Sequence, residues 1–331
     1  MSAEPTAGPT GRNDAQHDGS SDVVAGARAG AQNDVGAGPR DGAQNDVGAG
    51  PRDGAQNDVG GRGGGLFGSE LRTLFRRWRT LAILAVLAGV PVLLGVAVRL
   101  FSAPGSGEGP PMLDRVTQNG LFVGVAALIV SIPLFVPLAI GVVAGDAIAG
   151  EANLGTLRYL LLAPAGRTRL LLVKYAGAAV FCLVASLTVI VAGAIVGLVL
   201  FPIGPVTLLS GDTVGVGEAT VRALLVAGYV AVSMLGMSAI GLFISTLTEI
   251  PVGAMAATVT LAVTSQILDG IPQLDWLHPW LFTHYWLSLG DLLRVPLSWQ
   301  SFGQNAVLQA GYVAVFGALA WARFTSRDVL S

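Results

Sequence analysis

Long apolar runs separated by short polar stretches fill the chain from about residue 80 onward. This pattern is typical of a protein whose solvent is lipid, in which a spanning helix needs about 20 predominantly apolar residues. Six segments meet or approach that length, and we expect them to cross a membrane: 80–101, 121–145, 170–200, 220–247, 251–268 and 306–322. The predicted fold is therefore an all-α polytopic membrane protein with six transmembrane helices.

The residues directly before the first predicted span, 66–79, have the pattern of an amphipathic helix. Apolar residues recur there at helical spacing, and arginines fall on the other side of the helix. The apolar positions are Leu71, Leu74, Phe75 and Trp78, and the basic ones are Arg72, Arg76 and Arg79. A basic amphipathic helix beside a span is expected to lie in the plane of the membrane interface.

The first 65 residues contain no apolar run and include three similar twelve-residue units at 26–37, 38–49 and 50–61. Each unit offers only Val and Ala for burial, so a stacked core cannot offset the entropy of ordering the chain. We expect 1–65 to be a disordered, repeat-containing cytoplasmic tail without a signal peptide, because it lacks an apolar segment. The transmembrane domain is then 80–331.

Charge adds an orientation to this picture. Only 12% of the residues are charged, about half the usual share of a soluble protein, and the net charge of −2 argues against a nucleic-acid partner. The segments on the side of the tail hold ten basic residues and those on the other side four: Arg72, Arg76, Arg77, Arg79, Arg158, Arg167, Arg169, Lys174, Arg323 and Arg327, against Arg99, Arg115, Arg222 and Arg294. By the positive-inside rule, both termini are cytoplasmic in a multi-pass protein of the plasma membrane.

The segment 269–305 is too polar to span and too apolar to be a free loop. Its aromatic residues are typical of the membrane interface, so we expect short interfacial or re-entrant helices there, broken at prolines. The tryptophans are Trp276, Trp280, Trp286 and Trp299, and the prolines are Pro272, Pro279 and Pro296. His278 and His284 lack a third ligand nearby, and Cys182 is the only cysteine, so we expect no metal, cofactor or disulfide.

The polar residues between the second and third predicted spans follow an ordered pattern. Asp146 and Glu151 come first, followed by Gly155 and Thr156 and then by Arg158. A glycine can end one helix by adopting a left-handed backbone, and a threonine hydroxyl can cap the start of the next.

The second helix of this elbow is short, since it runs from Leu157 to about Leu162 before Pro164 ends it. Leu157, Leu160 and Leu161 give it an exposed apolar face. Such a face is suited to docking against a partner protein.

The elbow, which ends in a basic segment containing Lys174, resembles that of the type-2 ABC transporter permeases, the membrane subunits of many bacterial and archaeal exporters. The resemblance covers residues from about 66 to 331. It implies that 66–79 is a connecting helix and that 146–165 is the coupling-helix region, which contacts an ATP-binding cassette subunit. It also implies a second permease, identical or related. The residues carried over to coupling are Asp146, Glu151, Gly155, Thr156, Leu157, Arg158, Leu160 and Leu161.

No ATPase motif accompanies this elbow, because the only lysine is flanked by Val173 and Tyr175 rather than by the glycine and hydroxyl residues of a phosphate-binding loop. ATP hydrolysis is therefore expected on another polypeptide, and this chain is not expected to be an enzyme. A secondary transporter is the main alternative, although such proteins usually carry ionisable residues at mid-membrane. An intramembrane protease built on Ser238 would need a histidine on a facing span.

Two pairs of glycines, Gly141 with Gly145 and Gly193 with Gly197, have the spacing that lets helices approach closely. This motif predicts tight helix packing in any of these proteins. It does not identify a dimer interface, because a chain with 45 glycines contains such pairs by chance.

The charge count predicts which segments an external reagent can reach. A membrane-impermeant thiol reagent added to intact cells should label Ser106→Cys, Asp212→Cys and Gln273→Cys, because 102–120, 201–219 and 269–305 lie outside. Ser69→Cys and Ser326→Cys should react only after the cells are opened. Labelling of Ser326→Cys in intact cells would contradict the six-span topology.

Overall fold

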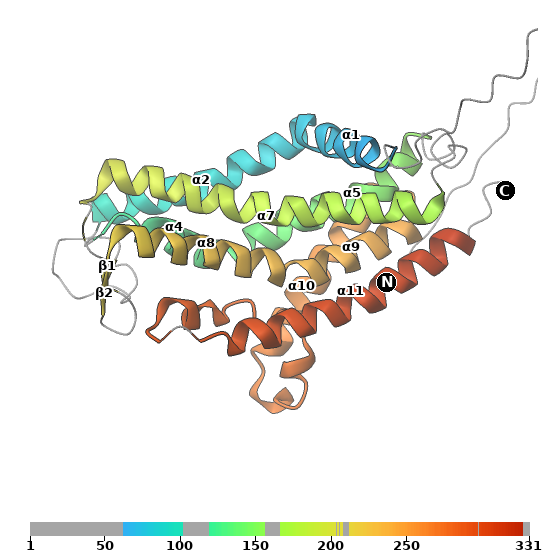
Figure 1. Ribbon diagram of the computed structural model, residues 1–331. Coiled ribbons are helices and arrows are strands. Elements are labelled where there is room, and N and C mark those ends of the chain that lie inside the picture. Colours follow the sequence, from blue (N-terminus) through green and yellow to red (C-terminus); the bar gives the residue numbers. More distant parts are fainter. Residues whose placement is uncertain are drawn as a thin grey trace, which may run out of the picture. The chain divides into compact units, whose positions relative to one another are not determined.

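Helices form nearly all of the structure in the computed structural model, which describes residues 62–101, 119–155, 166–202, 204, 206–207, 212–296 and 298–326 (Figure 1). These residues all belong to one structural unit, Asn57–Ser331. The α-helices are α1 (Arg62–Arg76), α2 (Trp78–Phe101), α4 (Phe122–Ser131), α5 (Phe135–Asn153), α7 (Arg167–Leu200), α8 (Val216–Ser233), α9 (Leu235–Leu247), α10 (Pro251–Asp269) and α11 (Gln300–Ser326). Two-residue strands β1 (Val206–Thr207) and β2 (Thr213–Val214) pair antiparallel.

Six helical segments are long and apolar enough to cross a membrane, which confirms the predicted fold class. They are α2, α5, α7, α8 together with α9, α10 and α11. The predicted amphipathic helix 66–79 forms α1, which ends earlier, at Arg76. Most of the predicted tail, 1–61, lies outside the described residues.

Two of the predicted spans are interrupted. The segment predicted as one span at 121–145 consists of α4 and α5, because Pro133 follows α4 and cannot continue a helical hydrogen-bond ladder. The span predicted at 220–247 is broken at Met234, where φ and ψ are −91° and −6°. The carbonyl of Ser233 at this break accepts a hydrogen bond of 2.9 Å from the indole nitrogen of Trp286.

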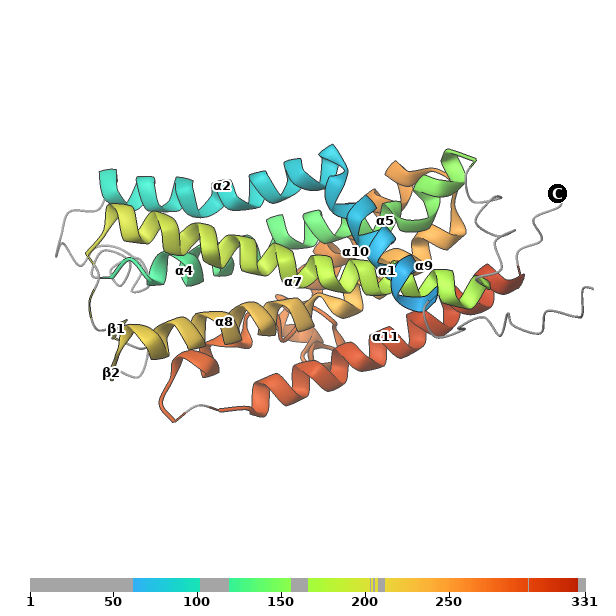
Figure 2. The ribbon, with the colours of Figure 1, turned by 45° about the horizontal axis from the view of Figure 1, so that its top comes forward.

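The long helices α2, α7, α8 and α11 run side by side in both views of the ribbon (Figures 1 and 2). α7 contacts α2 and α4 as well as α8, and α9 lies against α5 and α11. α10 packs on α5 and α9. We call the end of this bundle where α1 lies the α1 end.

Both predicted glycine pairs lie at close contacts between helices of this chain. A methyl group on Gly145 would lie 2.7 Å from the backbone nitrogen of Met255 in α10, and one on Gly141 would lie equally close to the side chain of Val259. Gly193 of α7 meets the backbone of α4 at Gly124, and Gly197 meets the backbone of Gly120, two residues before α4. The pairs therefore serve packing within the chain, as the sequence predicts.

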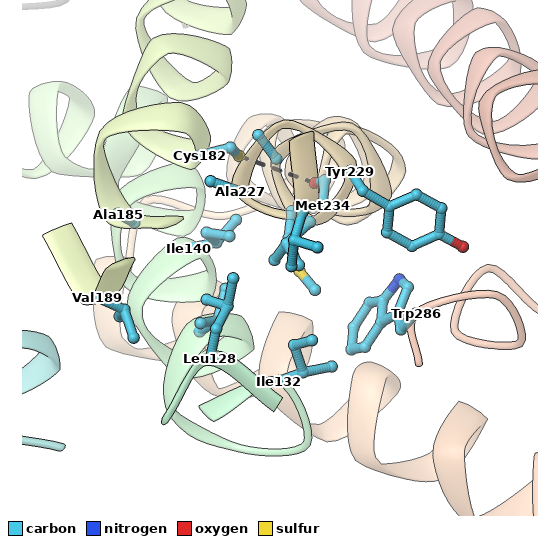
Figure 3. Close-up of a cluster of buried hydrophobic side chains, with 14 of the residues drawn as sticks. Leu128, Ile132, Ile140, Cys182, Ala185, Val189, Ala227, Tyr229, Met234 and Trp286 are labelled. Atoms are coloured by element: carbon cyan, nitrogen blue, oxygen red, sulfur yellow. Dashed lines mark hydrogen bonds between the residues drawn. The ribbon is translucent and has the colours of Figure 1, made fainter. Parts of the chain in front are cut away.

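The main hydrophobic core lies where the two interrupted spans meet (Figure 3). Ile132 at the first break and Met234 at the second are both fully buried, and Trp286 lies beside them with 2% of its surface exposed. Trp286 therefore packs inside the protein, with the carbonyl of Ser233 as the partner of its indole nitrogen, and its predicted level in the membrane stays a prediction. Trp276, Trp280 and Trp299 are exposed, as expected for interfacial residues.

The segment between α10 and α11 contains the short 3-10 helices η1 (Pro272–Leu274), η2 (His278–Trp280) and η3 (Ser288–Leu293). Short helices were expected, but Pro272 and Pro279 lie at the starts of two of them and do not break them, since a proline's missing N–H is tolerated in a first turn. The buried guanidinium of Arg222 donates to the carbonyls of Leu292 at 3.1 Å and Arg294 at 2.9 Å. These bonds hold the segment against α8.

Close contact between α4 and α7 predicts that Gly193→Ala destabilises the protein. The added methyl group would overlap the backbone of Gly124, and overpacking of this kind typically costs about 1–3 kcal/mol. We expect a lower thermal unfolding temperature in detergent. The matched control is Gly317→Ala in α11, where nothing lies within 4 Å of the added atom. Equal unfolding temperatures for the two variants would show that α4 and α7 do not depend on this contact.

Candidate functional site

The predicted coupling residues lie at and beyond the end of α5. Asp146 and Glu151 belong to the last two turns of this helix, and Gly155 follows it. The remaining five fall outside the described residues, so their predicted roles stay predictions: Thr156, Leu157, Arg158, Leu160 and Leu161.

The end of α5 has the geometry that the sequence predicts. Helix α5 stops at Asn153, and Gly155 has a φ of 69°, a left-handed value that favours glycine. The N–H of Gly155 donates to the carbonyl of Ala152 at 3.0 Å. The chain thus leaves the helix axis at the position where the elbow was expected to begin.

A buried lysine organises the α1 end of the bundle. The side chain of Lys174 in α7 is only 5% exposed, and its ammonium group lies 2.8 Å from a carboxylate oxygen of Glu70 in α1. It also forms a short ion pair with Glu151 of α5. Because an unpaired buried charge is very costly, these two acids allow the lysine to stay charged in this position. Three helices are joined through one side chain.

A second group of charges lies next to this lysine. Asp146 of α5 accepts from Arg77 at 3.2 Å and from Arg79 at 3.5 Å, at the junction of α1 and α2. A methyl group on Gly150 would lie 2.6 Å from an oxygen of Asp146, so glycine leaves room for the carboxylate there. The guanidinium of Arg79 also lies 3.5 Å from the sulfur of Met255 in α10.

The two charge groups line a common cleft between α1, α2, α5 and α7. It has a volume of about 40 Å³, and its charged lining consists of Glu70, Arg77, Arg79, Asp146 and Lys174. This space is enough for one or a few water molecules but not for an organic substrate. Within the described part of the chain, no three His, Cys, Asp or Glu residues are grouped in a way that could hold a metal ion. The arrangement joins α1, α2, α5 and α7 through charged side chains.

The other side of α5 is tied to α9 by a serine. The Ser245 hydroxyl accepts from the N–H groups of Ile148 and Ala149, at 3.0 and 2.8 Å, and donates to the carbonyl of Gly145 at 2.8 Å. All of these bonds are buried. Together with the close contact of Gly145 with α10, they hold the last turns of α5 from the side opposite the ion pairs.

Sequence reasoning located the acids but missed their partners. It did not name Lys174 as a partner for Glu151, and among the described residues Lys174 forms an ion pair with it. Two signals were present in the sequence. Lys174 is the only lysine of the chain, and Glu70 is the only acidic residue within 66–79.

The two histidines of the segment between α10 and α11 are brought together, with ring centroids 6.0 Å apart. His284 contacts the carboxylate of Asp269 at 2.6 Å, and His278 contacts the carbonyl of Ile271 at 3.1 Å.

The serine of the protease alternative has a partner of its own. The hydroxyl of Ser238 donates to the carbonyl of Leu235 at 2.8 Å. Within the described residues the serine and the histidines thus have separate partners, which does not favour the protease alternative.

Comparison with known protein families gives one match, to the family described as protein of unknown function DUF2705, over residues 114–330. The chain belongs to the DUF2705 family. No curated protein matches the sequence. The DUF2705 match includes Asp146, Glu151 and Lys174, whereas Glu70, Arg77 and Arg79 precede it. The ion pairs therefore connect the DUF2705 region to the amphipathic helix in front of it.

The network predicts that Lys174→Met is strongly destabilising. Removing one member of a buried ion pair leaves uncompensated charge and typically costs about 3–5 kcal/mol, and here Glu70 and Glu151 would both lose their partner. Thermal unfolding of the purified protein measures this loss. Arg323→Met, at an exposed arginine of α11, is the control and should change little.

A double variant separates charge from packing at this site. Adding Glu151→Gln to Lys174→Met removes one uncompensated carboxylate, so it should recover part of the lost stability. Purely additive losses would show that Lys174 and Glu151 do not interact in the folded protein.

Proposed function

We propose that this DUF2705 protein is the permease subunit of an ATP-binding cassette exporter, forms the translocation path and is driven by a separate ATPase subunit. The observation that carries the proposal is the buried ion pair between α5 and α7, the two helices that the elbow connects. Glu151 lies near the end of α5, and Lys174 lies near the start of α7. An ion pair between the end of one helix and the start of the next is suited to a protein in which force applied to the connecting loop moves two spans together.

Force on the elbow would reach most of the bundle through contacts that are already present. Lys174 would carry it to α1 through Glu70, whereas Ser245 and Gly145 would carry it to α9 and α10. Because packed helices shift as units, a push on one loop would then alter the angle between several spans. The partner supplying this push would dock on the apolar face predicted at Leu157, Leu160 and Leu161.

The distribution of charge supports ATP-driven over ion-driven transport. In the described spans, the Asp, Glu, Lys and Arg side chains lie within two turns of a helix end. Asp146 and Glu151 belong to the last two turns of α5, and Asp269 ends α10. Lys174 and Arg222 lie in the second turns of α7 and α8. Glu249 lies in the turn between α9 and α10. Proton or sodium coupling usually requires such groups near mid-membrane.

One observation favours the alternative, a secondary transporter that is not coupled to ATP. Interrupted helices often form the central site of such proteins, and two spans here are interrupted. The side chains at the second break are neutral, however. Gln309 accepts from the N–H of Gly236 at 3.1 Å and donates to the carbonyl of Phe282 at 2.8 Å, so it already has protein partners.

A second permease subunit, identical or related, is part of this proposal because the resembled exporters usually contain two. The glycine pairs do not provide its interface, because both are covered within this chain. Gly141 and Gly145 contact α10, and Gly193 and Gly197 contact the segment that holds Gly120 and the start of α4. The proposed location is the plasma membrane, with both termini in the cytoplasm. No cofactor is expected on this chain.

Co-purification with a candidate ATP-binding cassette subunit tests the proposal. We expect the wild type to retain the ATPase and Leu160→Asp to lose it, because an aspartate desolvated in an apolar contact costs several kcal/mol. Leu160→Met preserves the apolar surface and is the matched control. The Glu151→Gln variant should still bind the ATPase, but its transport-coupled ATP turnover in lipid should be lower. The reason is that α5 loses its ion pair with Lys174 of α7.

Two outcomes would contradict this reading. If Leu160→Asp retains the ATPase as well as Leu160→Met does, the apolar face predicted at Leu157, Leu160 and Leu161 is not the docking surface. If the wild type retains no ATP-binding cassette subunit at all, the exporter reading fails and the secondary transporter takes its place.

A further inference from the structure

The arginines around α1 fall into two groups that face opposite ways. Arg77 and Arg79 turn toward the bundle and pair with Asp146. Arg72 and Arg76 are exposed, and neither contacts a carboxylate among the described residues. The first pair is accounted for by the ion-pair network, whereas the second is not.

The outer face of α1 is open and polar. Gly65, Gly68, Ser69, Arg72, Thr73 and Arg76 are its exposed residues. The hydroxyls of Ser69 and Thr73 bond to backbone carbonyls of the helix itself, and no atoms lie within 4 Å of a methyl group placed on Gly65 or Gly68. The two arginines therefore lie one helical turn apart on a face whose other exposed side chains are small. Like charges at this spacing repel each other unless an anion lies between them.

The opposite face of α1 fixes where these arginines lie relative to lipid. Leu74 and Phe75 pack against the core of the bundle, and the ring of Phe75 lies 6.4 Å from that of Phe181 in α7. Directly after α1, Trp78 is 80% exposed and Leu81 is 47% exposed, both at the start of the spanning helix α2. Exposed apolar side chains at the start of a span face lipid, and tryptophan prefers the level of the headgroups. Because Arg76 is only two residues before Trp78, Arg76 and the preceding turn with Arg72 are expected near the headgroup level.

We propose that Arg72 and Arg76 form a binding site for the phosphate headgroup of an anionic phospholipid, whose acyl chains lie beside Trp78 and Leu81. Arginine suits this ligand because its planar guanidinium binds phosphate oxygens in a bidentate manner. An inorganic phosphate ion would satisfy the arginines but not the adjoining apolar surface, which is why the occupant is a lipid. Anionic lipid on the outer face and Lys174 on the inner face then hold α1 from two sides.

Native mass spectrometry of the purified full-length protein, titrated with dioctanoyl-phosphatidylglycerol or dioctanoyl-phosphatidylcholine, tests this site. We expect the wild type to prefer the anionic lipid. One basic side chain near an anionic surface strengthens binding by about fivefold, so the double variant Arg72→Gln/Arg76→Gln should lose about 30-fold in affinity for phosphatidylglycerol. Its affinity for phosphatidylcholine should fall much less, because the choline group neutralises the charge of that lipid's phosphate.

Three controls complete the experiment. Arg72→Lys/Arg76→Lys keeps the charge and should keep most of the preference, and Arg323→Gln removes an exposed arginine elsewhere at the α1 end and should keep all of it. Inorganic phosphate at the same concentration should not displace the lipid. Unfolding temperatures in neutral detergent should match the wild type, because Arg72 and Arg76 have no partner among the described residues.

An unchanged lipid preference in the double glutamine variant would overturn the site, and so would an equal loss in Arg323→Gln. Displacement by free phosphate would show an anion site without a lipid. If the double variant keeps its lipid preference but retains less of a co-purified protein, the face binds a protein. No ATPase is present in the lipid titration, so its result is independent of the proposed export function.

Discussion

A lysine buried at the edge of a membrane domain needs anionic partners, and this requirement determines how the α1 end of the protein is built. The side chain of Lys174 is only 5% exposed, and an isolated buried charge costs several kcal/mol, so its burial requires carboxylates nearby. Glu70 and Glu151 meet this need from two different helices, so α1 and α5 must both lie against α7 at the level of the lysine. The position of α5 in turn places Asp146 opposite Arg77 and Arg79.

Away from the charges, the spans are held by backbone contact. Gly145 lets α5 touch α10, and Gly193 lets α7 touch α4, with no side chain between the helices. In lipid there is little hydrophobic force between helices, so close packing and buried hydrogen bonds must supply the cohesion. Ser245 adds such bonds between α9 and α5. Helix α5 is thus fixed by ion pairs on one side and by backbone packing on the other, which makes it the best-anchored helix at the elbow.

Local features were predictable from the sequence, whereas features created by distant contacts were not. The six spans follow from hydropathy, which adds up along the chain, and the end of α5 follows from the backbone freedom of Gly155. The partners of Glu151 and Glu70 could not be read in this way, because Lys174 is 23 positions from one and 104 from the other. The break at Met234 contains no proline. At this break the carbonyl of Ser233 accepts a hydrogen bond from the indole of Trp286, a contact between residues 53 positions apart.

The two polar regions of the bundle differ in a way that bears on motion. At the Met234 break the groups are neutral and buried, as in the bond of 2.7 Å from the amide of Asn305 to the hydroxyl of Ser233. If α8 and α11 separated in lipid, these groups would find no water and would each cost the full desolvation penalty. The charges at the α1 end instead line a cleft of about 40 Å³, which can admit water. Hydrated charged groups can exchange partners at a lower free-energy cost than the buried neutral groups at the Met234 break. Under the proposed function, movement of the elbow would therefore rearrange the ion pairs around Lys174 while α8, α9 and α11 move as one unit.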